Sequence, residues 1–357
     1  MKSATNQYTI SIISNSKNID NRQKKLKIIF SLLILSIIVA IIAKPDLCIG
    51  SIYAGLSVWA KCVLPSLLPF MFFTKLLTNL NFISKITAKT YKLNKVLFKA
   101  PKISSYIFLM SIISGYPVGA KIISEYHKKG LISTKQACKL STFCSTSGPL
   151  FVIGTVGTVL FGDVKLGYIL FLSHLFGSVL NGILYRNFFV DENNYFDKLN
   201  YNSNINKKQL EKQTENMLAE SMKDTILSSL IVGGYVAISF LVIDLCLELN
   251  IFEPIIFVML KIFSFSGITK ETISAFLCGI LEVSKGVVEL SKLQISKTVL
   301  STLASFLIGF GGISIFMQAF TFLKDAKVSS KFYLFQKFTH AIFSSVLTFL
   351  LCLLFKI

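Results

Sequence analysis

Long apolar segments joined by short polar ones make up most of this chain. Helices that cross or partly cross a membrane are predicted at residues 28–43, 62–80, 103–113, 150–161, 166–189, 226–249, 251–265 and 338–354. A helix needs about 20 apolar residues to cross the hydrocarbon of a bilayer, so the shorter segments favour broken or re-entrant helices. The pattern therefore predicts an all-α polytopic membrane protein.

Two stretches rich in Gly, Ser and Pro interrupt the apolar pattern in the first half. Ser114-Gly115-Tyr116-Pro117 and Ser145-Thr146-Ser147-Gly148-Pro149 each predict the end of one helix and the start of another. Gly relaxes the backbone, and Pro is favoured as the first helical residue. Each new helix N-terminus leaves unpaired N–H groups that suit an anion. Within a bilayer such breaks are tolerated only against protein or a water-filled cavity, as in secondary transporters.

The second half repeats these features in the same order. Gly279, Lys285 and Glu289 are spaced like Gly115, Lys121 and Glu125, and Ser296, Phe306 and Gly311 are spaced like Ser133, Phe143 and Gly148. We therefore expect two inverted repeats with broken helices, at residues 28–189 and 217–357. A polar linker (190–216) separates them, and a disordered cytoplasmic tail (1–27) precedes them. The breaks at Cys278–Glu282 and Gly309–Gly312 should share one cavity with those of the first half.

Composition agrees with a membrane protein and argues against several functions. The 357 residues are 53% hydrophobic and 15% charged, whereas soluble domains have about 25% charged residues. The net charge of +19 comes mostly from lysines that flank apolar segments, which favours contact with anionic lipid over nucleic acid. Basic residues before Ile28 predict a cytoplasmic N-terminus. The seven Cys and three His lack metal-binding or catalytic spacing, so we expect no metal, no cofactor and no enzyme activity. The oligomeric state stays open.

Four segments carry a family resemblance. SGYPVGAKI, FCSTSGPLFVIG, LEVSKG and GFGGISIFMQ resemble the YlbJ/SpoVV-type sporulation integral membrane proteins. These belong to the nucleoside-recognition (Gate) group, which is similar in architecture to concentrative nucleoside transporters. The resemblance runs from about residue 28 to the C-terminus. It implies transport of dipicolinic acid across the outer forespore membrane during spore formation.

Dipicolinate is a flat pyridine ring with two carboxylates, so its site needs positive potential at two ends and an apolar surface between them. Lys121 and Lys285 are candidate partners for the carboxylates, because bases inside a membrane are costly and usually functional. Alternatively, they form i,i+4 pairs with Glu125 and Glu289. Glu282 could carry a coupling proton, bind Na⁺ or pair with Lys285. The full candidate set is Ser114, Gly115, Tyr116, Pro117, Lys121, Ser145, Thr146, Ser147, Gly148, Glu282, Lys285, Gly311, Gly312, Ser314 and Gln318.

Other functions fit the same pattern. The broken helices could line a gated channel or a nucleoside-type solute transporter, and the chain could be a structural or signalling membrane protein of sporulation. The paired breaks favour a transporter of a small anionic solute, because alternating access needs two elements moving about one site. His174 is expected to be a packing residue rather than a proton relay.

Overall fold

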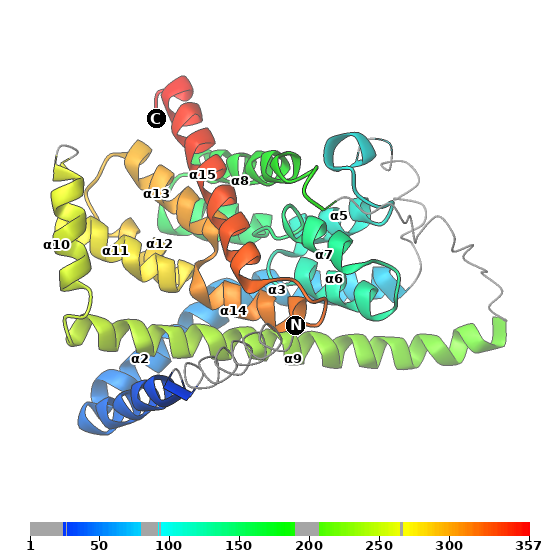
Figure 1. Ribbon diagram of the computed structural model, residues 1–357, viewed down its shortest axis with the longest axis horizontal. Coiled ribbons are helices and arrows are strands. Elements are labelled where there is room, and N and C mark those ends of the chain that lie inside the picture. Colours follow the sequence, from blue (N-terminus) through cyan, green and yellow to red (C-terminus); the bar gives the residue numbers. More distant parts are fainter. Residues whose placement is uncertain (1–23, 26, 80–91, 93, 190–206, 265–266) are drawn as a thin grey trace, which may run out of the picture. The chain divides into compact units, whose positions relative to one another are not determined.

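A computed structural model describes residues 24–79, 92–189, 207–264 and 267–357, apart from residues 26 and 93 (Figure 1). The regular structure of these residues is helical, without strands. Five helices among them are long and apolar enough to cross a membrane: Pro45–Leu77, Val164–Leu184, Met217–Glu248, Lys297–Leu323 and Ser330–Phe355. The prediction of an all-α polytopic membrane protein is confirmed.

The chain divides into two compact units, residues 1–51 and 52–357. The first unit contains an apolar helix, Lys27–Ala43, where the sequence predicts one. Helix α2 (Pro45–Val58) begins in this unit. The predicted disordered tail lies almost wholly outside the described residues. The expected domain boundaries stay a prediction.

Within the second unit, two series of helices follow the same plan. The first is α5 (Ser104–Ser114), α6 (Val118–Lys128), α7 (Thr134–Ser141), the π-helix η2 (Leu150–Leu160) and α8 (Val164–Leu184). The second is α11 (Lys270–Leu281), α12 (Val283–Ser291), α13 (Lys297–Phe310), α14 (Gly312–Leu323) and α15 (Ser330–Phe355). The breaks fall at matching places in both series. Each helix of one series thus has a counterpart in the other, in the order that the predicted repeat requires.

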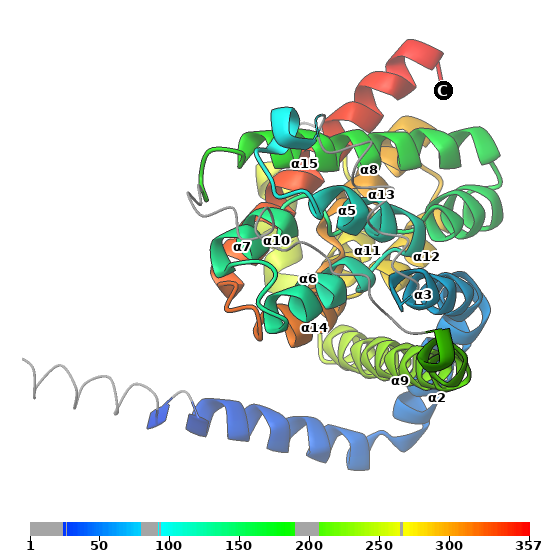
Figure 2. The same ribbon diagram turned by 90° about the vertical axis from the view of Figure 1, so that its right-hand side faces the viewer.

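Most contacts between the two series are those of a two-fold relation, although α13 also packs on α8 without an equally close contact between α7 and α15. Helix α6 packs on α14, and their counterparts α12 and η2 also pack together. Helix α8 packs on its own counterpart α15 (Figures 1 and 2). Exchanging the two series therefore leaves this set of contacts unchanged, as a two-fold interface requires. The orientation of the axis in the membrane plane stays a prediction.

The two-sided character of α8 suits a helix between protein and lipid. Leu172, Phe176 and Leu180 are exposed along one face, whereas His174 and Ser178 are buried along the other. A soluble helix has the opposite arrangement, with its polar face outward.

The helices that precede each series differ from the sequence prediction. A single apolar stretch, α2, η1 (Trp59–Val63) and α3 (Leu64–Asn79), stands where the sequence predicts a helix only at 62–80. Helix α9 (Lys207–Glu248) is long, packs on α3, and extends into the predicted linker; residues 190–206 lie outside the described part. Helix α10 (Glu253–Ile262) stands where a span is predicted at 251–265, but it rises only about 15 Å at 1.5 Å per residue, too little to cross a bilayer.

Candidate functional site

The two breaks of the first repeat lie against each other. Helix α5 ends at Ser114, and Gly115 follows with φ of 74°. A side chain at Gly115 would place its Cβ 2.6 Å from the backbone nitrogen of Gly148, in the second break. Only glycine allows both this φ and this approach. The peptide bond between Tyr116 and Pro117 is cis.

The helix boundaries at these breaks correct one detail of the sequence analysis. Pro117 precedes α6 as its N-cap instead of being its first helical residue, because its carbonyl already accepts the N–H of Lys121 at 3.1 Å. Pro149 likewise precedes η2. The breaks themselves are where the sequence predicts them.

The two breaks of the second repeat also adjoin. Glu282 is extended (φ −144°) between α11 and α12, and its Oε2 accepts the backbone N–H of Lys285 at 2.7 Å. Gly311 and Gly312 have φ of 87° and 74° between α13 and α14. A Cβ at Gly312 would lie 3.1 Å from the carbonyl oxygen of Gly279. The region from Thr272 to Leu293 is thus broken, as the repeat requires.

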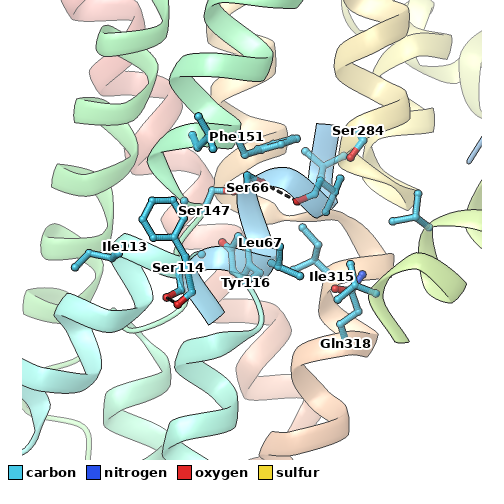
Figure 3. A pocket seen from close by; sticks show the side chains of 18 of the residues that line it. Ser66, Leu67, Ile113, Ser114, Tyr116, Ser147, Phe151, Ser284, Ile315 and Gln318 are labelled. Atoms are coloured by element: carbon cyan, nitrogen blue, oxygen red, sulfur yellow. Dashed lines mark hydrogen bonds between the residues drawn. The ribbon is translucent and has the colours of Figure 1, made fainter. Parts of the chain in front are cut away.

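Both repeats contribute to one pocket of about 580 Å³, open solvent included (Figure 3). The first repeat supplies residues from both of its breaks, and the second supplies Glu282 and residues of α12 and α14. Residues of α3 and α9 complete the wall. Pocket residues discussed below are Ser66, Phe70, Ser114, Gly115, Tyr116, Ser147, Gly148, Phe151, Glu282, Ser284 and Gln318. A cavity common to the two repeats is therefore present, lined by both breaks of the first repeat and by Glu282 of the second, whereas Gly309–Gly312 are not among its lining residues.

The structure brings seven of the predicted site residues to this pocket: Ser114, Gly115, Tyr116, Ser147, Gly148, Glu282 and Gln318. The remaining eight are not among its lining residues: Pro117, Lys121, Ser145, Thr146, Lys285, Gly311, Gly312 and Ser314. Of these, Ser314 accepts a hydrogen bond from the side-chain amide of Gln318 at 3.3 Å and so helps to hold Gln318 in the pocket wall. Whether the lining residues bind substrate stays a prediction.

The two lysines expected at the cavity point elsewhere. The Lys121 ammonium donates to Ser228 on α9 at 3.0 Å, and Glu125 pairs with Lys75 at 3.1 Å instead of with Lys121. The Lys285 ammonium pairs with Asp244 on α9 and lies 4.8 Å from the ring centre of Phe240. The two ammonium groups therefore do not lie where the sequence predicts them. The reason is that α9 packs beside both repeats and supplies the groups that they bond. The alternative i,i+4 pairs are not formed either.

A buried base that the sequence analysis missed lies behind the pocket wall. Lys337, near the start of α15, is 2% exposed and donates to the hydroxyl of Tyr116 and to the backbone oxygen of Ser145 at 3.1 Å. The sequence predicts a final span that begins at Phe338, which places Lys337 just outside it as a flanking residue. Its position one helical turn before His340 was the available sequence signal, because an apolar helix that carries both residues has a polar face.

Two histidines extend this buried group. The ring centres of His174 and His340 lie 4.7 Å apart. His174 accepts the backbone N–H of Ser147, in the pocket wall, at 2.8 Å. This hydrogen bond holds the second break in place, so His174 has a structural role beyond the packing that we expected of it.

The comparisons with known proteins agree with the motif resemblance. No protein-family model matches the chain, and no solved structure matches it either. The chain is 23% identical over 336 residues to the sporulation integral membrane protein YlbJ of Bacillus subtilis (strain 168), and the match covers 87% of this chain and 79% of YlbJ. The wider link to nucleoside-recognition proteins stays a prediction. In the four motifs and over most of its length, the chain is similar to a YlbJ-type sporulation integral membrane protein.

Proposed function

We propose that this protein is a secondary transporter of a small aromatic dicarboxylate, of the dipicolinate type, in spore formation. The observation that carries the proposal is the single pocket lined by breaks from both repeats. A transporter needs one site that two moving elements can open in turn, and broken helices of repeated halves supply such a site. The YlbJ similarity supports a membrane role in sporulation. The dipicolinate assignment and a place in the outer forespore membrane, with the N-terminus cytoplasmic, rest on the motif resemblance and the basic flank.

The chemistry of the pocket suits a flat ring with polar ends. Phe70, Phe151 and the ring of Tyr116 provide apolar and aromatic surface. The amide of Gln318 is a neutral hydrogen-bond donor beside it, and the hydroxyl oxygens of Ser66 and Ser284 are polar groups whose protons go to the Val63 carbonyl at 2.8 Å and to Glu282. Sites of this kind use an apolar lining for affinity and a few placed polar groups for orientation.

Glu282 gives the pocket a carboxylate, which bears on the coupling ion. It is 1% exposed and accepts hydrogen bonds from the backbone of Lys285 and from Ser284. A dianionic solute and an ionised Glu282 would repel strongly in a low-dielectric pocket. We therefore propose that Glu282 binds a proton or Na⁺ when the solute is bound, so that cation and anion move together.

Uptake of radiolabelled dipicolinate into proteoliposomes tests the proposal. We expect saturable uptake that a pH or Na⁺ gradient accelerates. Gln318→Leu should reduce uptake at least about tenfold, because a hydrogen bond to a charged group contributes about 1.5–3 kcal/mol. Met317→Leu, at an exposed neighbouring position, is the matched control and should transport normally. Uptake no faster than into protein-free liposomes would refute the function.

A further inference from the structure

The buried group around Lys337 is placed where it can act on a bound solute. Lys337 contacts Tyr116, and Tyr116 lines the pocket. The ammonium also lies 4.6 Å from the centre of the Tyr116 ring. Lys337 is thus separated from the pocket by a single side chain.

The hydrogen bonds of Lys337 fit the protonated ammonium. Its nitrogen has three partners: the Tyr116 hydroxyl, the Ser145 carbonyl oxygen at 3.1 Å and Nδ1 of His340 at 3.3 Å. An ammonium has three N–H donors and no acceptor, so three acceptors match it. A neutral amine has two N–H groups and one lone pair, so it would fit these positions only if the Tyr116 hydroxyl donated to it, which would leave Tyr116 no proton for the pocket.

The tautomers of the neighbouring histidines agree with this assignment. Nε2 of His340 faces the carbonyl oxygen of His174 at 3.1 Å and must donate to it, which leaves Nδ1 free to accept from Lys337. Nε2 of His174 accepts the Ser147 N–H, so the His174 proton is on Nδ1. Both imidazoles are therefore neutral in this arrangement, and the positive charge of the group belongs to Lys337.

This charge is unmatched inside the protein. Among the described residues, no carboxylate forms an ion pair with Lys337, whereas Lys285 is paired with Asp244. A buried ion without a counter-ion is costly, so an anion arriving nearby is strongly favoured. The Tyr116 oxygen accepts from Lys337 and forms no other hydrogen bond with the described residues, so its proton is available to a ligand in the pocket.

We propose that Lys337 supplies the fixed positive charge of the pocket and that the Tyr116 hydroxyl presents it to a carboxylate of the solute. The ammonium polarises the phenol, which makes its O–H a stronger donor toward an anion. The proposal deepens the transport function above and rests on it for the choice of solute. It replaces Lys121 and Lys285 as the source of positive potential.

Binding of two probes of one shape tests this assignment. Dipicolinate and its uncharged analogue pyridine-2,6-dicarboxamide are titrated calorimetrically into purified full-length protein in detergent. Wild type should prefer dipicolinate by about tenfold or more, the range expected for a charge-assisted hydrogen bond. Lys337→Met should bring the two affinities to near equality, and Lys337→Arg should keep most of the preference. Tyr116→Phe should lower the preference while keeping the ring.

Folding and transport are measured separately. Lys337→Met should elute as wild type in size-exclusion chromatography and melt no lower, because it removes an unmatched buried charge. If it does not fold, Tyr116→Phe decides the question alone. A preference for dipicolinate unchanged in Lys337→Met or in Tyr116→Phe would overturn the proposal, as would a wild type that binds the diamide equally well. Intact, Lys337-dependent binding without uptake into proteoliposomes would support this site and refute transport.

Discussion

Two acids of the second repeat, Glu282 and Asp244, have different surroundings and therefore different expected roles. Glu282 is in the pocket and accepts hydrogen bonds from Ser284 and from the backbone of Lys285, without a cationic partner among the described residues. Asp244, on α9, is paired with the ammonium of Lys285 outside the pocket. The first can exchange a cation during transport, whereas the second is held by a permanent counter-charge.

Glu282→Gln should uncouple transport from the cation gradient. Glutamine keeps the size and can still accept the Lys285 N–H, but it neither ionises nor binds a proton. We expect dipicolinate binding to persist while uptake no longer responds to the imposed pH or Na⁺ gradient. Glu289→Gln on the same helix, where Glu289 pairs with Lys292 at 2.8 Å, is the control. A normal gradient response in Glu282→Gln would contradict the coupling role.

Lys285→Met should destabilise the protein without acting on the pocket charge. Its side chain is 8% exposed, and its removal leaves Asp244 without its counter-ion, which we expect to cost about 3 kcal/mol. The double variant Lys285→Met with Asp244→Leu removes both charges and should recover most of that loss. Thermal melts in detergent compare the two. Equal melting temperatures for single and double variants would show that the pair does not hold α9 to α12.

Lys337 shows where sequence reasoning at the level of single residues reaches its limit. Lys121, Lys285 and Lys337 all stand beside apolar runs, and hydropathy does not separate them. What separates them is the counter-ion that a distant helix supplies, and α9 supplies it for Lys285 but not for Lys337. Which lysine gains a counter-ion depends on how the helices pack, and hydropathy does not show this. The pocket residues next to Gly and Pro were therefore predictable, whereas the lysine that we propose as the source of positive charge was not.

At the scale of elements, the breaks were predictable because Gly and Pro act locally. Capping is local too, because Ser133 and Gln136 form a capping box at the start of α7. The lengths of α9 and α10 were not predictable in this way. A short apolar helix and a spanning helix have similar local hydropathy, and neighbouring helices decide which one forms.

Gly119→Ala tests how tightly the two breaks of the first repeat are packed. A Cβ at Gly119 would lie 1.9 Å from the carbonyl oxygen of Cys144, a backbone atom that cannot move without displacing the second break. We expect a loss of ~3 kcal/mol in stability, the upper range for overpacking, together with loss of uptake. Melting temperature and uptake are the measurements.

Gly234→Ala on α9 is the matched control. No atom lies within 4 Å of the position of its Cβ, so the higher helix propensity of Ala should leave stability equal or raise it. A Gly119→Ala protein as stable as Gly234→Ala would mean that α6 and Cys144 do not approach each other this closely.

At the scale of the whole repeat unit, residues 52–357, the helices of the two repeats correspond, but the functional side chains at corresponding places differ. His174 and His340 occupy the same position relative to the starts of α8 and α15 and meet ring to ring where these counterpart helices cross. Tyr116, linked to Lys337, lies in the first break of one repeat, and Glu282 lies in the corresponding break of the other. The symmetric breaks suit alternating exposure, and the unequal side chains suit a solute and a cation that bind at different ends.

Alternating access predicts that the pocket is open to only one side of the membrane at a time. Ser147→Cys, in a variant without the seven native cysteines, places a thiol in the pocket, and Val159→Cys, at an exposed position of η2, is the reference. In vesicles, a membrane-impermeant maleimide applied to one face should label Cys at position 147 on that face only, and saturating dipicolinate should slow this labelling at least about tenfold without affecting position 159. Reversing the solute gradient should move the reactivity of position 147 to the other face, because the loaded site must open there to release its solute. A gated channel predicts instead that opening exposes position 147 to both faces together, since one continuous pore replaces the two alternately closed ends. Simultaneous labelling from both sides would therefore exclude the transporter and leave the channel.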